Sequence, residues 1–128
     1  MTSEPDPADP IYHLALRDEW QQAAESGSGY RRSTLGASLD EVGFIHCSFA
    51  HQVQRIADLV YRDRTDVLLL KIDPSFVGAE VRVENTEGGE NLFPHIYGPL
   101  PVAAVVRAEP VPLGADGRLS LGPLPRTR

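Results

Sequence analysis

The sequence has few of the features that mark the specialised classes of protein. Cys47 is the single cysteine among 128 residues, so no internal disulfide can form and a reducing cytoplasm is the expected location. No apolar run approaches membrane-spanning length, and the start MTSEPDPADP lacks the basic and apolar regions of a signal peptide. Twelve basic against eighteen acidic residues give a net charge of −6, which is not the basic footprint of a nucleic-acid-binding protein.

The remaining composition is that of an ordinary globular domain. Apolar residues make up 41% and charged residues 23% of the chain, both close to the averages for globular proteins. A chain of this length can fold around one core. We therefore expect one domain at residues 10–112, a disordered lead-in at 1–9 and a turn-rich tail at 113–128, in a monomer or a small homo-oligomer.

Local patterns predict a small α+β domain with two helices packed on a split, mixed or antiparallel sheet. Trp20 and two alanines recur at helical spacing after the first strand, and Gly27 is placed to end that helix. A loop is expected at 26–35. The predicted strands are 11–16, 44–47, 66–73, 80–84, 93–97 and 101–111. The run DVLLLKID at 66–73 is expected to be the central strand, and alternating Val81 and Val83 mark a strand with one wet face.

The stretch GFIHCSFAHQ, residues 43–52, joins a short strand to a predicted helix at 49–62. Ser48 is a favoured helix N-cap, and Phe49 begins an apolar repeat of helical period. On this reading His46 faces the helix start, where free backbone N–H groups favour a phosphate or carboxylate. Gln52 in the first turn can reach the same place. Cys47 points the other way and is interpreted as a small buried hydrophobe.

Three histidines on separate predicted strands, His13, His46 and His95, are the main functional signal. If 93–97 is extended, His95 and Tyr97 share a face, and Pro94 favours an edge strand or a strand start. Three histidines can bind zinc, but no HxH or HExxH pair supports such a site, so no metal is expected. The alternative for each histidine alone is a structural role in the core.

Two other groups of side chains complete the set of candidates. Arg31 and Arg32, in a glycine-rich loop, can form a bidentate phosphate clamp or remain solvated charges. Glu84 ends an alternating strand at the mouth of a glycine-containing loop, as a catalytic carboxylate or as an ordinary exposed residue. Motifs for a nucleophile elbow, a phosphate-binding loop or paired glycosidase carboxylates are absent from the sequence.

Several of these segments together resemble the bacterial family of domain of unknown function 952 (DUF952). The resemblance rests on IYHL, an early tryptophan, GFIHCS followed by Gln52, a strand ending in Glu84, and FPHIYGPL before a valine-rich strand. It covers about residues 10–108. At fold level that family is similar to the ADP-ribosyltransferases, which hold NAD in the cleft of a split β-sheet.

The resemblance implies roles for particular residues. His13 matches the first-strand position that contacts the adenosine ribose. His46 and Ser48 match the position that seats nicotinamide, where a tyrosine is common in the transferases. Glu84 matches the catalytic glutamate, and His95 and Tyr97 are additions of this family.

We therefore expect an NAD-dependent ADP-ribosyltransferase-like or NAD-glycohydrolase-like enzyme. Its catalytic residues would be His46, Glu84 and His95, and its substrate-binding residues His13, Arg31, Arg32, Ser48, Gln52 and Tyr97. A non-catalytic module that binds a nucleotide or another phosphorylated metabolite is the first alternative. A histidine-bound metal hydrolase is the second.

Overall fold

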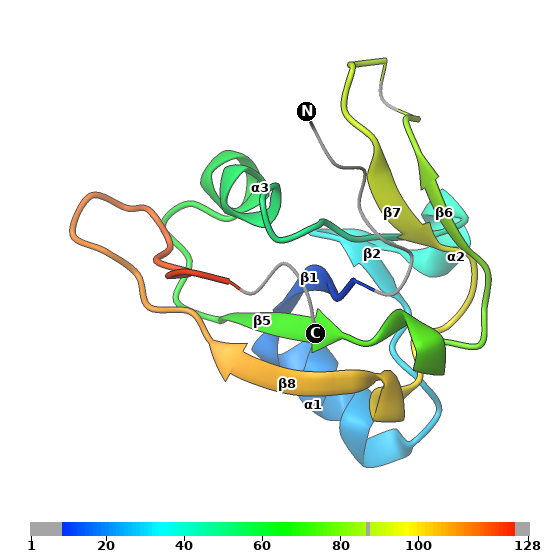
Figure 1. The fold of residues 1–128 in the computed structure, drawn as a ribbon. Helices are drawn as coiled ribbons and strands as arrows, with labels where there is room; N and C mark the ends of the chain where they lie inside the picture. The colour runs from blue at the N-terminus through cyan, green and yellow to red at the C-terminus, as the bar shows by residue number, and fades with distance from the viewer. Residues whose placement is uncertain (1–8, 87, 125–128) are drawn as a thin grey trace.

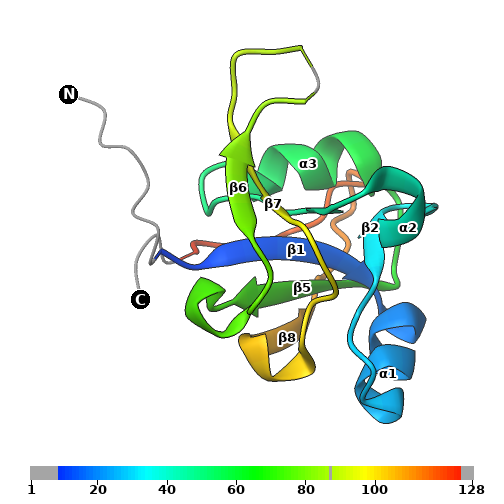
Figure 2. The same ribbon diagram turned by 90° about the vertical axis from the view of Figure 1, so that its right-hand side faces the viewer.

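The computed structural model describes residues 9–86 and 88–124. Most of the expected lead-in at 1–9 and the last four residues of the tail lie outside the described residues. The elements run in the order β1 (Ile11–Leu16), α1 (Arg17–Ser26), β2 (Arg32–Thr34), β3 (Ala37–Ser38), α2 (Leu39–Val42), β4 (Ile45–His46), α3 (Val53–Val60), β5 (Val67–Ile72), η1 (Pro74–Phe76), β6 (Val81–Glu84), β7 (Phe93–Ile96), η2 (Val102–Ala104) and β8 (Val105–Pro110). Figures 1 and 2 show α3 and α1 at opposite ends of the stack of strands.

Two three-stranded sheets form the body of the fold, and every strand pair in them is antiparallel. The first has the order β1-β5-β8, which confirms 67–72 as a central strand, and the second has the order β4-β7-β6. The sheets join where Tyr12 and Ser48 exchange backbone hydrogen bonds of 2.7 and 2.8 Å. Strands β6 and β7 cross the direction of β1, and the loop between them projects past α3 (Figure 2). The predicted α+β class is confirmed, and residues 9–86 and 88–124 hold three α-helices instead of the two expected.

The alternation in β1 divides the core into two clusters of apolar side chains. Ile11 and Ala15 belong to one cluster, while Tyr12 and Leu14 belong to the other. Because successive strand residues point to opposite faces, a fully buried strand such as β1 must fill both clusters. In the described part of the chain, no helix is long and apolar enough to cross a membrane.

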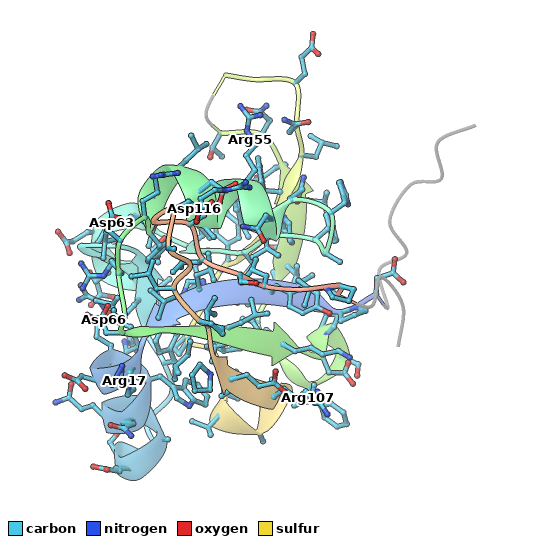
Figure 3. The ribbon with its side chains drawn as sticks, turned by 90° about the vertical axis from the view of Figure 1, so that its left-hand side faces the viewer. Arg17, Arg55, Asp63, Asp66, Arg107 and Asp116 are labelled. Atoms are coloured by element: carbon cyan, nitrogen blue, oxygen red, sulfur yellow. The ribbon has the colours of Figure 1, made fainter. Side chains whose placement is uncertain are left out.

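The first helix follows the predicted pattern closely. Trp20 and Ala23 are buried, and Gly27 ends the helix at φ 70° with its N–H bonded to the Ala23 carbonyl. The left-handed conformation at this position is one that glycine adopts without strain. Ala24, expected on the buried stripe, is exposed. The Arg17 side chain, labelled at the start of α1 in Figure 3, donates to the Thr65 carbonyl at 3.0 Å.

The helix predicted at 49–62 is shorter, and Ser48 is not its cap. The helix begins at Val53 and ends at Val60. The backbone N–H and C=O of Ser48 form a bridge with Tyr12. The Phe49 N–H donates to the Gln52 side-chain oxygen at 3.0 Å. Bridge formation therefore holds Ser48 in the sheet, and one irregular turn separates it from the helix.

The segment expected as a loop before Gly43 contains a hairpin and a short helix. Strands β2 and β3 pair, and Ser38 then caps α2 through a reciprocal pair of hydrogen bonds with Glu41. The signal was present in the sequence, since serine followed three residues later by glutamate is the pattern of a capping box.

Pro94 was expected on an edge strand or at a strand start, and the second alternative holds, because Pro94 is the second residue of β7, although that strand is central in its sheet. The Cys47 N–H donates to the Pro94 carbonyl at 3.0 Å, and proline has no N–H to return. Strand β4 pairs with β7 over only two residues, so the missing hydrogen bond falls at the end of a short ladder. This position makes proline tolerable in a central strand.

Two further expectations need correction at the margins of the fold. In β6, Val83 is 48% exposed, whereas the Glu84 side chain, expected on the wet face, is only 26% exposed. In the expected tail, Leu119 is 2% exposed and its carbonyl accepts from Gln54 of α3 at 2.9 Å. Residues 113–124 thus contribute to the second core cluster.

Candidate functional site

His13 is sealed inside the first sheet, with both ring nitrogens bonded. It is 3% exposed. Its Nδ1 donates to the His46 carbonyl at 2.7 Å, so Nε2 accepts from the Tyr30 hydroxyl at 2.9 Å. Burial, the largest cause, lowers the pKa of His13 to about 4. The ring is neutral at pH 7 and ties β1 to the strand that carries His46.

A small cavity lies beside His13 and His46. It has a volume of about 10 Å³ and is also lined by Ser33 and Ser48, so it has room for about one water molecule. Ser33 is 1% exposed, and its hydroxyl has no hydrogen-bond partner among residues 9–86 and 88–124. This space is too small for a metabolite.

His95 is buried in the second sheet but is bonded through only one nitrogen. It is 1% exposed, and its Nδ1 donates to Glu84 Oε2 at 2.8 Å. The Tyr97 hydroxyl donates to the same oxygen. His95 Nε2 is buried and lacks a hydrogen-bond partner within the described part of the chain. The register of β6 against β7 brings Glu84 close to His95, because Glu84 pairs with Phe93, which lies two residues before His95 on β7.

The Glu84 carboxylate is held in its ionised form. Hydrogen bonds from Tyr97 and then from His95 lower the pKa of the Glu84 carboxyl below its usual value. The same contact raises the pKa of Tyr97. The Arg82 guanidinium lies 4.2 Å from the centre of the Tyr97 ring, in the geometry of a cation–π contact. An ionised carboxylate only accepts hydrogen bonds, so Nδ1 of His95 carries a proton.

Aromatic rings surround His95 on two sides. Phe44 is stacked on it with 4.0 Å between ring centres, and the His46 ring is 5.4 Å away. Phe93 in turn lies 5.1 Å from His46. The three predicted histidines are therefore neighbours, but they do not open on one cavity, since His13 and His46 line the small cavity and His95 lines a different pocket.

That pocket, here called the α3-loop pocket, has a volume of about 190 Å³. It lies between α3 and the loop that joins β6 to β7. Its apolar wall is formed by Ile56, Leu59 and Phe93, its polar wall by loop residues that include Asn85, Thr86 and Asn91, and its charged or titratable groups are Arg55 and His95.

Arg55 supplies the positive charge of the α3-loop pocket. Figure 3 shows it extending from α3 towards the β6–β7 loop. It is exposed, and no ion pair or hydrogen bond joins it to another described residue. A guanidinium with no carboxylate partner remains available to an anion.

The other predicted substrate-binding residues lie elsewhere or are engaged. Arg31 and Arg32 line a separate groove of about 380 Å³ beside α1. Arg32 pairs with Glu19 at 2.8 Å and Arg31 lies 3.5 Å from Asp40. This groove shares no lining residue with the α3-loop pocket.

Gln52, expected to bind substrate, bridges two backbone groups. Its oxygen accepts from the Phe49 N–H and its amide nitrogen donates to the Leu92 carbonyl at 2.7 Å. It thereby fixes the start of α3 against the chain entering β7. Cys47 is 1% exposed, and burial raises the pKa of its thiol, which confirms it as a buried apolar residue.

The described residues contain no group of three histidine, cysteine, aspartate or glutamate side chains placed to hold a metal ion. The predicted site residues do not include Arg55, Phe44 or Phe93. Strand alternation does predict that Phe44 shares a face with His46 and Phe93 with His95, but it gives neither phenylalanine a role in the site. Arg55 carried no such signal.

Comparison with known proteins places the chain in a family. The family described as "Protein of unknown function (DUF952)" matches residues 14–108. The chain is similar to the crystal structure of protein CC0527 from Caulobacter crescentus, at 33% identity and a TM-score of 0.76 over 88% of this chain and 94% of that one. The solution NMR structure of CC0527 gives 35% identity and a TM-score of 0.72 over 88% and 93%. A comparison with curated proteins finds no relative. The chain belongs to the DUF952 family.

Proposed function

We propose that the α3-loop pocket binds a small phosphorylated metabolite of the nucleotide class. His95 is the observation that carries this proposal, because its ring is buried and its Nε2 has no partner among the residues described. Leaving a buried polar atom without a hydrogen bond costs about 1–3 kcal/mol. A ligand that supplies the missing bond recovers that energy on binding.

The tautomer of His95 determines what the ligand must offer. Glu84 is ionised and can only accept, so Nδ1 of His95 carries the proton. In a ring that carries this single proton, Nε2 is an acceptor. The ligand is therefore expected to present an N–H or O–H group at this end of the pocket.

Arg55 determines the charge of the ligand. Its guanidinium is suited to a bidentate contact with a phosphate group. The net charge of −6 repels anions on average, so an arginine that pairs with none of the described residues provides a local site of opposite sign at this pocket. A ligand with one donor group and one phosphate matches both residues.

The pocket's size favours a small ligand. Its volume of about 190 Å³ is below the roughly 300–1,000 Å³ of sites that enclose a drug-sized molecule. A mononucleotide or phosphosugar is closer to this scale than a dinucleotide such as NAD, of which only a part would be enclosed.

The test is a ligand titration on matched variants, followed by NMR amide shifts. AMP, ribose 5-phosphate, ADP-ribose and NAD are the probes. Arg55→Gln should weaken the binding of every phosphorylated probe about tenfold, as loss of one charge-assisted contact predicts. Arg107→Gln removes the same charge on β8, far from α3 (Figure 3), and should leave binding unchanged. If none of the probes shifts the pocket's amides, the proposal is wrong.

A second candidate function is cleavage of NAD in the manner of an ADP-ribosyltransferase or NAD glycohydrolase. Glu84 favours it, because its Oε2 takes both bonds from Tyr97 and His95 while Oε1 accepts none from the described residues. An ionised carboxylate stabilises the oxocarbenium-like cation formed as the bond to nicotinamide breaks. Release of nicotinamide from NAD, lost in Glu84→Gln, would support this activity, and intact NAD after long incubation would exclude it.

A further inference from the structure

We infer that the ligand of the α3-loop pocket is a nucleoside monophosphate that enters base first, with the base against His95 and Phe93 and the phosphate outside at Arg55. The inference rests on the proposed function and specifies its ligand. The two residues of the pocket that can carry a charge, His95 and Arg55, differ in how far they are buried.

His95 and Arg55 lie at opposite depths. His95 is 1% exposed, whereas Arg55 is exposed. Burying a phosphate away from water is far more costly than burying a neutral group with one satisfied hydrogen bond. The neutral end of the ligand is therefore expected beside His95 and the charged end beside Arg55.

The surfaces near His95 suit a flat ring. Phe44 covers one face of the imidazole and Glu84 takes Nδ1, so the ligand is inferred to meet the opposite edge of the ring, which carries Nε2. Phe93 and Ile56 provide apolar surface, and Leu59, 67% exposed, extends that wall outward. An aromatic base stacks on such a surface, whereas a sugar alone has no planar face to offer.

The opposite wall carries groups that read the edge of a base. Thr86 and Asn91 line the pocket and are exposed, and a side-chain amide both donates and accepts hydrogen bonds. Nε2 of His95 requires a hydrogen-bond donor, and a ring N–H or an exocyclic amine of the base supplies one. One apolar wall, one amide-bearing wall and one buried acceptor together describe a site for a nitrogenous base.

The experiment compares nucleotides with the same phosphate lacking a base. Isothermal titration would give the affinity of the wild-type chain for AMP, GMP, CMP, UMP and ribose 5-phosphate. At least one nucleotide should bind about tenfold or more tightly than ribose 5-phosphate, since stacking of one base on an aromatic side chain has an effect of this order. Equal affinities of ribose 5-phosphate and all four nucleotides would overturn this inference and leave the proposed function standing.

Two variants separate the two ends of the ligand. Leu59→Ala should weaken the preferred nucleotide several-fold and leave ribose 5-phosphate unchanged, and it is compatible with folding because Leu59 is an exposed helix residue and alanine favours helix. Arg55→Gln should weaken both by the same factor. Val106→Ala, an exposed apolar position on β8, is the matched control. If Leu59→Ala weakens both probes equally, the base does not lie on that wall; if no phosphorylated probe binds the wild type, the proposed function itself fails.

Discussion

The two sheets each bury a histidine, and the two rings differ in how completely they are bonded. His13 in β1 is 3% exposed and His95 in β7 is 1% exposed. Both nitrogens of His13 are bonded within the protein, whereas His95 is bonded to the other described residues through Nδ1 alone. The burial of the two rings is nearly equal, so their hydrogen bonding is what distinguishes them.

The difference teaches that exposure alone does not separate the two histidines. His13 joins β1 to the backbone of β4 and to Tyr30, and its network is closed. His95 is held at one end by Glu84, and the residue lines the α3-loop pocket. A closed network contributes to stability, and an open one is available for binding. The substitutions below test that division.

The largest effect is expected from His13→Ala. The substitution removes the bonds that His13 makes to the Tyr30 hydroxyl and to the His46 carbonyl and opens a cavity in a packed sheet. Two lost buried hydrogen bonds, together with lost packing, predict a decrease of about 3–5 kcal/mol in the free energy of unfolding. Urea denaturation followed by circular dichroism measures it. A decrease below about 1 kcal/mol would contradict the structural role of His13.

The pH dependence of stability tests the same residue without mutation. The folded-state pKa of His13 is about 4, against an ordinary value of 6.5, chiefly because of burial. Between these values the unfolded chain binds a proton that the folded chain does not, so this contribution is complete above pH 6.5 and is lost as the pH falls towards 4. The full difference corresponds to roughly 3 kcal/mol.

Urea denaturation between pH 7 and pH 4 measures this loss, and NMR of the ring nitrogens should show His13 still neutral at about pH 5. His51→Gln, which removes an exposed imidazole, is the control and should leave the slope nearly unchanged. Titration of the His13 ring near its ordinary pKa would show that the network is not closed.

Sequence patterns predicted the elements better than the contacts between them. The alternation in IYHLAL and the apolar run at 67–72 identify β1 and β5, because burial on two faces imposes a pattern visible in the sequence. Ser48 shows the limit of such reasoning, since its propensity to cap a helix is overridden by a bridge to Tyr12, a residue distant in the sequence.

The candidate site was predictable in its residue types but not in its pairings. His95, Glu84 and Tyr97 were expected near one another, yet their hydrogen bonds depend on the register of β6 against β7. A shift by one residue would turn Glu84 to the other face. Arg55 has the local pattern of any solvated helix residue, and only the loop folded opposite it forms the pocket.

A smaller effect on stability, with a clear effect on binding, is expected from His95→Asn. The asparagine amide can replace Nδ1 as donor to Glu84 but has no atom at the position of Nε2. We expect a decrease in stability of about 1–2 kcal/mol from the lost stacking on Phe44, and at least about tenfold weaker binding of the nucleotide. His95→Gln, which reaches the Nε2 position but not Nδ1, is the complementary variant. Unchanged affinity in His95→Asn would show that Nε2 does not contact the ligand.

The smallest effect is expected from Tyr97→Phe, which tests how Glu84 holds the His95 tautomer. The hydroxyl of Tyr97 is the largest cause of the lowered pKa of Glu84, so its removal should raise that pKa towards its ordinary value of 4.5 and take away, at pH 7, the small part of the stability that this hydrogen bond supplies. A carboxyl with a lowered pKa stabilises the fold above its unfolded-state value and ceases to do so as the pH falls through the folded value. Tyr97→Phe should therefore reduce the acid dependence of stability below about pH 4.5, measured as the difference from the wild type. NMR titration of the Glu84 side chain reports the pKa directly.

Because His95 still donates to Glu84 in the Tyr97→Phe variant, Nδ1 should remain protonated and nucleotide affinity should be nearly retained. A large loss of affinity would show that Tyr97 contacts the ligand itself.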